Sequence, residues 1–197
     1  MDNNHLLDKF FQNIESISPL SEKAKDLARP YLKIHTFKPN SHIIDAGDEV
    51  QYSYFIISGI ARYFYINDEG KEYNKSFIKD GDVLMSFSAF LLQLPSEYFI
   101  ESLSELKTVR ISHKDLKTLT KDSSEWYQLY VSFLEKVLMK KVQRESDLLL
   151  LNAKQRYLKF LNNFKEIEDK IPNYHIASYL GITDVRLSNI RRELNLT

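Results

Sequence analysis

The side chains whose chemistry is most readily interpreted lie near the end of the chain, between positions 183 and 192. Aspartate can accept a hydrogen bond from cytosine, asparagine can pair with adenine, and valine can contact the methyl group of thymine. Arginine, serine and threonine bind phosphate oxygens. The candidates for base contact are Asp184, Val185 and Asn189, and those for phosphate contact are Thr183, Arg186, Ser188, Arg191 and Arg192. This set predicts contact with double-stranded DNA.

Two short helices would have to position these side chains, and the surrounding apolar residues have the spacing of a helix-turn-helix. Counted from Asn173, the apolar positions are Ile176, Leu180, Ile182, Leu187 and Ile190, with small Ala177 among them. Pro172 suits the start of the first helix, Gly181 suits the left-handed turn, and Thr183 is the expected N-cap of the second helix. The polar residues would then face outward, as on a recognition helix in the major groove. The alternative is an ordinary helical hairpin packed on a larger domain.

The charge distribution agrees with a DNA-binding end. The whole chain has a net charge of zero, but residues 152–197 carry eight basic and five acidic side chains, a net charge of +3. The remaining residues therefore carry a net charge of −3. If the small basic domain is joined to a larger acidic domain, only the basic end of the molecule attracts the phosphates of DNA.

The composition excludes several other classes of site. Without cysteine, disulfides, thiolate metal sites and iron–sulfur clusters are excluded, which suits a reducing cytoplasm. The five histidines show no paired ligand spacing and are expected at the surface, so no metal or cofactor is expected. Nucleophile, phosphate-loop and metalloprotease motifs are absent, which argues against an enzyme. Residues 1–11 have no basic flank or long apolar run and are not expected to form a signal peptide, and no apolar run approaches the roughly 20 residues of a membrane span.

The first half of the chain has the pattern of an antiparallel β-roll. Gly47, Gly59, Gly70 and Gly81 are spaced by 12, 11 and 11 residues and separate short β-prone runs. Strands are expected at 42–44, 54–57, 61–66 and 73–78, with a hairpin turn at 67–70, and a second set at 98–103 and 106–111. Helices are expected before the roll at 6–16 and 21–31, the second capped by Ser21.

A long helix is expected after the roll, capped by Ser123 or Ser124. Its wide apolar stripe suggests a self-pairing dimer seam, because a reader with one such DNA motif usually needs two half-sites. The seam candidates are Trp126, Leu129, Tyr130, Phe133 and Val137. The alternative is a helix packed flat on its own roll. The expected domains are a sensor roll with N-terminal helices at 1–120, a dimerisation helix at 121–151 and a helix-turn-helix domain at 152–197.

Taken together, these features resemble the Crp/Fnr family of bacterial transcription regulators over nearly the whole chain. The matching segments are 37–40, 45–48, 54–59, 70–72 and 80–82 in the roll, and 176–183 with 188–192 near the end. The resemblance implies an α+β fold: an N-terminal antiparallel β-roll of the cyclic-nucleotide-binding, jelly-roll type with flanking helices, a long dimerisation helix and an all-α helix-turn-helix domain. It also implies a homodimer on a palindromic DNA operator and a small-molecule effector. RNA polymerase is a candidate further partner.

The chain departs from the family at the residues that decide what is sensed. Cyclic-nucleotide-binding members carry a glutamate for the ribose and an arginine for the phosphate at positions that correspond to Ser86 and Ser96. Losing a charged hydrogen bond costs roughly 1.5–3 kcal/mol, and the neighbouring Glu97 adds repulsion, so useful binding of cyclic AMP is not expected. Lys75 or Lys79 is an alternative cation. The candidate pocket residues are Tyr63, Tyr65, Phe77, Ser86, Phe87, Ser96 and Tyr98.

Two interpretations of the sensor and one of the whole chain remain open. An apolar or aromatic effector and no effector at all fit the roll equally well.

The DNA-reading positions also differ from those of familiar members, which typically have arginine, glutamate and arginine where this chain has Asp184, Val185 and Asn189. The operator sequence should therefore differ as well. The alternative function is a ligand-binding or protein-interaction roll whose helix-turn-helix is vestigial.

Overall fold

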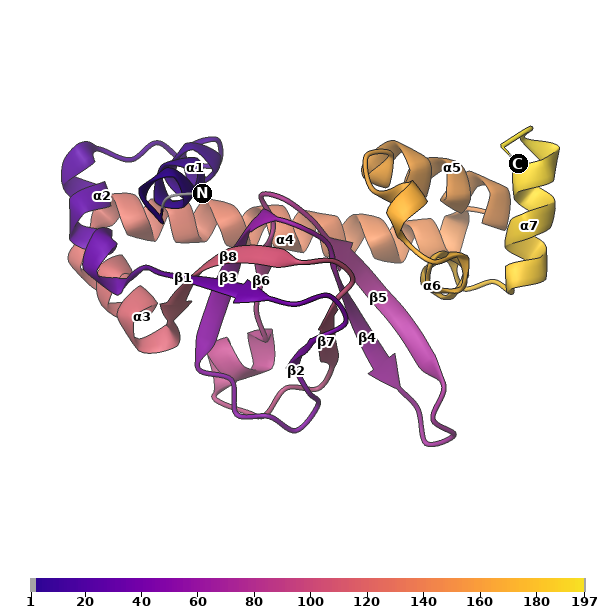
Figure 1. Ribbon diagram of the computed structural model, residues 1–197, viewed down its shortest axis with the longest axis horizontal. Coiled ribbons are helices and arrows are strands. Elements are labelled where there is room, and N and C mark those ends of the chain that lie inside the picture. The colour runs from indigo at the N-terminus through magenta and orange to yellow at the C-terminus, as the bar shows by residue number, and fades with distance from the viewer. Residues whose placement is uncertain (1–2, 197) are drawn as a thin grey trace.

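The computed structural model describes residues 3–196, which form an α+β fold of two antiparallel sheets, a long helix and a group of C-terminal helices (Figure 1). The helices are α1 (Asn3–Glu15), α2 (Glu22–Ala28), α3 (His113–Asp122), α4 (Ser124–Leu150), α5 (Ala153–Phe164), α6 (Asn173–Leu180) and α7 (Asp184–Glu193). The strands are β1 (Lys33–Phe37), β2 (His42–Ile44), β3 (Tyr52–Ser58), β4 (Ala61–Ile66), β5 (Glu72–Ile78), β6 (Val83–Leu84), β7 (Phe99–Ser102) and β8 (Leu106–Ser112). None of the described helices is long and apolar enough to cross a membrane.

Two four-stranded sheets make up the roll within the described residues, with strand orders β1-β8-β3-β6 and β2-β7-β4-β5. Side chains from both sheets meet between them in one buried cluster, which includes Ile56, Leu84 and Ile100. The six predicted strands are present at or within two residues of their expected bounds. Strands β1 and β6 were not predicted, and β1 completes its sheet by pairing along β8 from Lys33↔Arg110 to Phe37↔Leu106.

Tight turns set the register of the roll. In the β4–β5 hairpin, the backbone N–H of Gly70 donates to the Asn67 carbonyl (2.9 Å) and the N–H of Asn67 donates to the Lys71 carbonyl (3.0 Å), as the predicted turn requires. Gly59 joins β3 to β4 with φ of +114°, and a Cβ there would lie 2.2 Å from the Glu105 carbonyl oxygen. Only glycine allows this close approach of two backbones.

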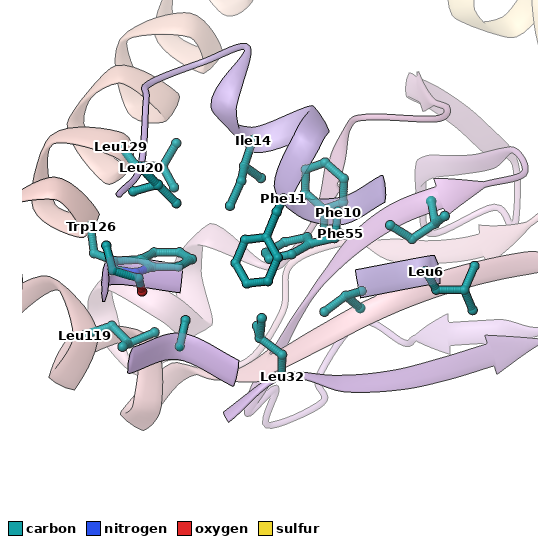
Figure 2. Packing of buried hydrophobic residues seen from close by; sticks show 14 residues of the cluster. Leu6, Phe10, Phe11, Ile14, Leu20, Leu32, Phe55, Leu119, Trp126 and Leu129 are labelled. Carbon is teal, nitrogen blue, oxygen red and sulfur yellow. The ribbon is translucent and has the colours of Figure 1, made fainter. Parts of the chain in front are cut away.

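The beginning of α4 is part of the roll's own hydrophobic core. Ser123 is its N-cap, as predicted, and Trp126 and Leu129 are buried in a cluster formed by α1, α2, the outer face of the β3-containing sheet and α3 (Figure 2). The Trp126 indole N–H donates to the Ala24 carbonyl across 2.9 Å. The assignment of Trp126 and Leu129 to a dimer seam is therefore wrong, because these side chains are already covered within one chain.

Farther along α4 the apolar side chains become more accessible. Tyr130, Phe133 and Val137 are partly buried, so the seam prediction stays open for them. Beyond them, Leu138 and Val142 are 59% and 50% exposed. The helix spans the molecule, with α1 and α2 at one end and α5 to α7 at the other (Figure 1).

The C-terminal helices share a hydrophobic core with the roll. Phe77 of β5 lies against the rings of Phe160, Phe164 and Tyr179 at centroid distances of 5.5–6.0 Å. The prediction that Phe77 lines the effector pocket is therefore wrong. The alternation of side chains along β5 predicts which residues share a face of the sheet. It does not predict which of the two faces the C-terminal helices cover, and this is why Phe77 was assigned to the pocket.

A buried polar network joins the same two parts. Arg62 of β4 is 4% exposed, and its guanidinium donates to Glu72 (2.5 Å) and Glu101 (2.7 Å). Its Nη1 also donates to Nδ1 of His175 in α6 (3.2 Å), and Nδ2 of Asn74 donates to the same nitrogen (3.1 Å). His175 is 4% exposed, which corrects the expectation of a surface histidine. The network fixes α6 against the β4–β5 hairpin.

Burial and the Arg62 charge act together on His175. Desolvation, followed by repulsion from Arg62, lowers the pKa of the His175 imidazole to about 4, and Glu72 opposes this weakly. The imidazole is therefore neutral at pH 7 and accepts hydrogen bonds at Nδ1, since arginine can only donate.

Acid should therefore weaken the attachment of the C-terminal helices. Between pH about 6.5 and about 4 the unfolded chain protonates His175 while the folded chain does not, so stability present at neutral pH is lost as pH falls through this window. The loss in free energy of unfolding is at most about 3.5 kcal/mol, because one pKa unit corresponds to about 1.4 kcal/mol. Urea unfolding of the wild type and His175→Gln at pH 7 and pH 4.5 measures it.

Glutamine keeps an oxygen that can accept from Arg62 but does not titrate, so His175→Gln should show a smaller loss of stability in acid. The pKa values of His35 and His113 are also lowered by burial, so only the difference between the two proteins is informative. Substituting exposed His5 by glutamine is the matched control. An equal acid response in the wild type and His175→Gln would contradict the assignment.

Candidate functional site

The helix pair α6 and α7 forms over the residues that the sequence predicts. Gly181 has φ of +67°, and its N–H caps α6 by donating to the Ala177 and Ser178 carbonyls. Thr183 is the N-cap of α7, and its hydroxyl accepts from the N–H of Arg186 (3.2 Å). The apolar positions fill the angle between the helices, with Ile176, Ala177, Leu180, Leu187 and Ile190 buried and Ile182 partly buried.

The outward face of α7 carries most of the predicted contact residues. Asp184, Arg186, Ser188 and Arg192 are exposed, and Asn189 is partly buried. Val185 is 71% exposed, so its apolar side chain is accessible on the same face. The Arg186 guanidinium lies 3.6 Å from the Glu193 carboxylate, an exposed pair that costs little to break.

Arg191 does not belong to that face. Its guanidinium donates to the Tyr157 hydroxyl (2.8 Å), to Oδ1 of Asn173 (2.6 Å) and to the Glu168 carboxylate. These bonds join α7 to α5, to the start of α6 and to the turn at Glu168–Lys170. The side chain therefore holds the domain together, and the prediction that it binds phosphate finds no support in this geometry.

The roll interior brings together Tyr63, Tyr98, Ser86 and Ser96. The Tyr98 hydroxyl donates to the Met85 carbonyl (3.0 Å), and the Tyr63 hydroxyl accepts from the Met85 N–H (3.0 Å). Ser96 donates to the Tyr98 carbonyl (2.9 Å), and the Ser86 and Ser88 hydroxyls are 3.0 Å apart. Ser86 and Ser96 are buried and already hydrogen-bonded, so neither presents a charge or a free donor to a phosphate.

Lys75 stands at the centre of this group. Its Nζ lies 3.9 Å from the Tyr98 ring centroid, 5.4 Å from that of Tyr65 and 5.9 Å from that of Tyr63. Burial, with repulsion from Lys141 of α4, lowers the pKa of the Lys75 ammonium to about 8. Cation–π attraction to three tyrosines compensates part of its lost hydration. The roll therefore contains a cation of its own, enclosed by aromatic rings.

Most of the residues predicted to line the effector pocket therefore lie close together in the roll. Tyr63, Tyr65, Ser86, Phe87, Ser96 and Tyr98 lie around Lys75 or bond to its neighbours, with the Phe87 N–H donating to the Tyr98 hydroxyl (3.1 Å). The sequence offered Lys75 only as an alternative cation, because a lysine in an alternating strand is usually solvated. No group of three or more His, Cys, Asp or Glu residues that could hold a metal occurs in the part of the chain that the structure describes.

Sequence comparison matches the roll to a cyclic nucleotide-binding domain. The family of cyclic nucleotide-binding domains matches residues 34–123, from β1 to the end of α3. A comparison with curated proteins finds no match.

Comparison with solved structures extends the likeness to nearly the whole chain. FixK2 from Bradyrhizobium japonicum superposes with a TM-score of 0.72 at 15% identity, covering 83% of this chain and 84% of its own. CLP from Xanthomonas campestris, described as a c-di-GMP responsive global regulator, gives 0.70 at 14%, covering 89% and 92%. A protein from Eubacterium rectale, described as a transcriptional regulator of the crp/fnr family, gives 0.70 at 20%, covering 90% and 84%. Residues 34–123 thus match a cyclic nucleotide-binding domain, and the chain has the fold of Crp/Fnr-type regulators.

Proposed function

We propose that the protein is a sequence-specific, DNA-binding transcription regulator of Crp/Fnr type and not an enzyme. The observation that carries this proposal is the outward face of α7, where polar, basic and apolar side chains stand exposed on a helix fixed by a buried apolar core. Its position next to a cyclic nucleotide-binding domain fits a sensor joined to a reader. Bacterial cytoplasm is the proposed location.

The proposed contacts follow from side-chain chemistry. Asp184, Val185 and Asn189 would contact base edges in the major groove, and Arg186 and Arg192 would bind phosphates. Thr183 and Ser188 would add hydroxyl contacts to the backbone of the duplex. Arg191 would act indirectly by holding α7 in place.

The proposed active form is a homodimer on a palindromic operator. The accessible part of α4 beyond Phe133 supports it, because Leu138, Met139 and Val142 are at least 50% exposed and apolar. Pairing there would involve Tyr130, Phe133 and Val137 at its edge, and would place two copies of α7 on two half-sites. RNA polymerase is a candidate further partner.

The proposed effector is something other than cyclic AMP, or there is none. Ser86 and Ser96 are neutral and buried, and Lys75 is partly buried against three tyrosine rings, so a cyclic phosphate would have to compete with those rings for the cation. The alternative function, a ligand-binding or interaction roll with a vestigial helix-turn-helix, is favoured by the tight docking of α6 on the β4–β5 hairpin. DNA binding distinguishes the two.

The purified protein should enrich a palindrome from a random library of DNA duplexes. Arg192→Ala should then weaken binding to the enriched duplex and reduce the slope of log affinity against log salt by about 1, because one phosphate contact is lost. Fluorescence anisotropy over a series of salt concentrations measures both quantities.

Lys114→Ala is the matched control, since it removes an exposed positive charge from α3 of the sensor. It should leave the salt slope unchanged. Failure to enrich any sequence, or equal slopes for the two variants, would favour the vestigial-motif alternative.

Calorimetric titration with cyclic AMP should give no binding in the micromolar range. The loss of two charged partners costs about two decades of affinity or more. A micromolar dissociation constant would contradict this, and in that case Lys75→Met would show whether Lys75 supplies the missing cation.

A further inference from the structure

An apolar pocket that is partly open to solvent lies outside the roll interior. It is a cavity of about 100 Å³ between α1, the first turns of α4 and the outer face of the β3-containing sheet. Its walls include Phe10 and Ile14 from α1, Phe55 from β3, and Trp126, Leu129 and Phe133 from α4. Figure 2 shows several of these side chains around the same region.

The cavity walls are almost entirely apolar, with one serine among them. Ser53 lines the cavity, is 4% exposed, and its hydroxyl has no hydrogen-bond partner among the described residues. It lies on the same face of β3 as Phe55 and Ile57, which belong to the surrounding core. A buried hydroxyl without a partner is unfavourable, so its presence requires an explanation.

Other buried serines of the roll differ in this respect. The Ser102 hydroxyl donates to the Lys38 carbonyl (2.7 Å) and the Ser96 hydroxyl to the Tyr98 carbonyl (2.9 Å). Water is a poor occupant of the cavity, because an ordered buried water needs two to four polar partners. An apolar molecule with one hydrogen-bonding group would satisfy Ser53 and the apolar walls together.

We propose that this cavity binds a small aromatic molecule carrying one hydroxyl group, and that Ser53 determines its preference for the hydroxyl. The inner volume of about 100 Å³ is smaller than the roughly 150 Å³ of an apolar cavity that accommodates benzene, so an aromatic ring would fill the pocket and leave one edge in its open mouth. The site is distinct from the Lys75 site, where a cation lies beside the rings of Tyr63, Tyr65 and Tyr98.

The cavity is well placed to influence the C-terminal helices. One of its walls is α4, and the other end of that helix binds the C-terminal helices through Asp147–Lys159 (2.6 Å) and through Arg144, which donates to the Tyr179 carbonyl. A ligand that displaces α4 from the sheet would therefore act on α6 and α7. This consequence rests on the proposed function, whereas the binding site does not.

The test uses 4-fluorophenol and fluorobenzene as probes on the full chain, followed by ¹⁹F NMR. Trp126 is the only tryptophan in the chain and lines the cavity, so its fluorescence reports occupancy independently. Both probes should bind saturably, with 4-fluorophenol tighter by about 3- to 10-fold, the usual worth of one hydrogen bond. Ser53→Ala should remove that preference while retaining binding of fluorobenzene.

Two further variants complete the design. Val83→Phe, from a partly buried position on the cavity wall, should weaken both probes by about 10-fold or more, because it fills the space. Ser102→Ala is the matched control: it should keep the preference for 4-fluorophenol but lower the melting temperature. Ser53→Ala should not lower the melting temperature, since no hydrogen bond is lost.

Several outcomes would overturn the proposal. They are the absence of saturable binding by folded wild-type protein at millimolar probe, unchanged binding in folded Val83→Phe, and an unchanged preference in Ser53→Ala. Each readout is independent of DNA. Probe binding without any effect on DNA affinity would leave the site established and count only against its coupling to α7.

Discussion

The anchorage of the first turns of α4 is the interaction on which the rest of the structure depends. Trp126 and Leu129 are buried against α1, α2 and the roll, and the indole N–H bond to Ala24 fixes the ring. Burying two such side chains contributes several kcal/mol by area, roughly 1.5–3 kcal/mol each. Because α5 to α7 follow α4 in the chain, their position relative to the roll depends on this anchorage.

The hydrogen bonds of Arg62 fix the orientation of α6 against the roll. A buried guanidinium is costly unless it is paired and hydrogen-bonded, and here Glu72, Glu101, Asn74 and His175 satisfy it. Apolar contacts such as those of Phe77 tolerate sliding, whereas these bonds require one orientation of α6. Hydrophobic burial thus supplies much of the stability of the joint, and the polar network defines its geometry.

The sequence predicted local structure better than it predicted what covers each surface. Gly181, Thr183 and the apolar spacing determine the α6–α7 pair through short-range effects, so that pair was predictable. The apolar stripe of α4 was equally compatible with a dimer seam and with an intramolecular core, because periodicity marks a buried face without naming its partner. For the same reason Phe77 was assigned to the wrong side of β5. Arg191 and His175 depend on contacts between segments far apart in the chain, which no local pattern encodes.

Only two residues, Leu151 and Asn152, connect α4 to α5, so this connection allows little change in the distance between the roll and the C-terminal helices. α6 is also hydrogen-bonded to the β4–β5 hairpin. The C-terminal helices are therefore attached to the rest of the molecule at two places, the α4–α5 connection and the contact between α6 and the hairpin. Any movement of the C-terminal helices relative to the roll must therefore break or rearrange one of these two attachments.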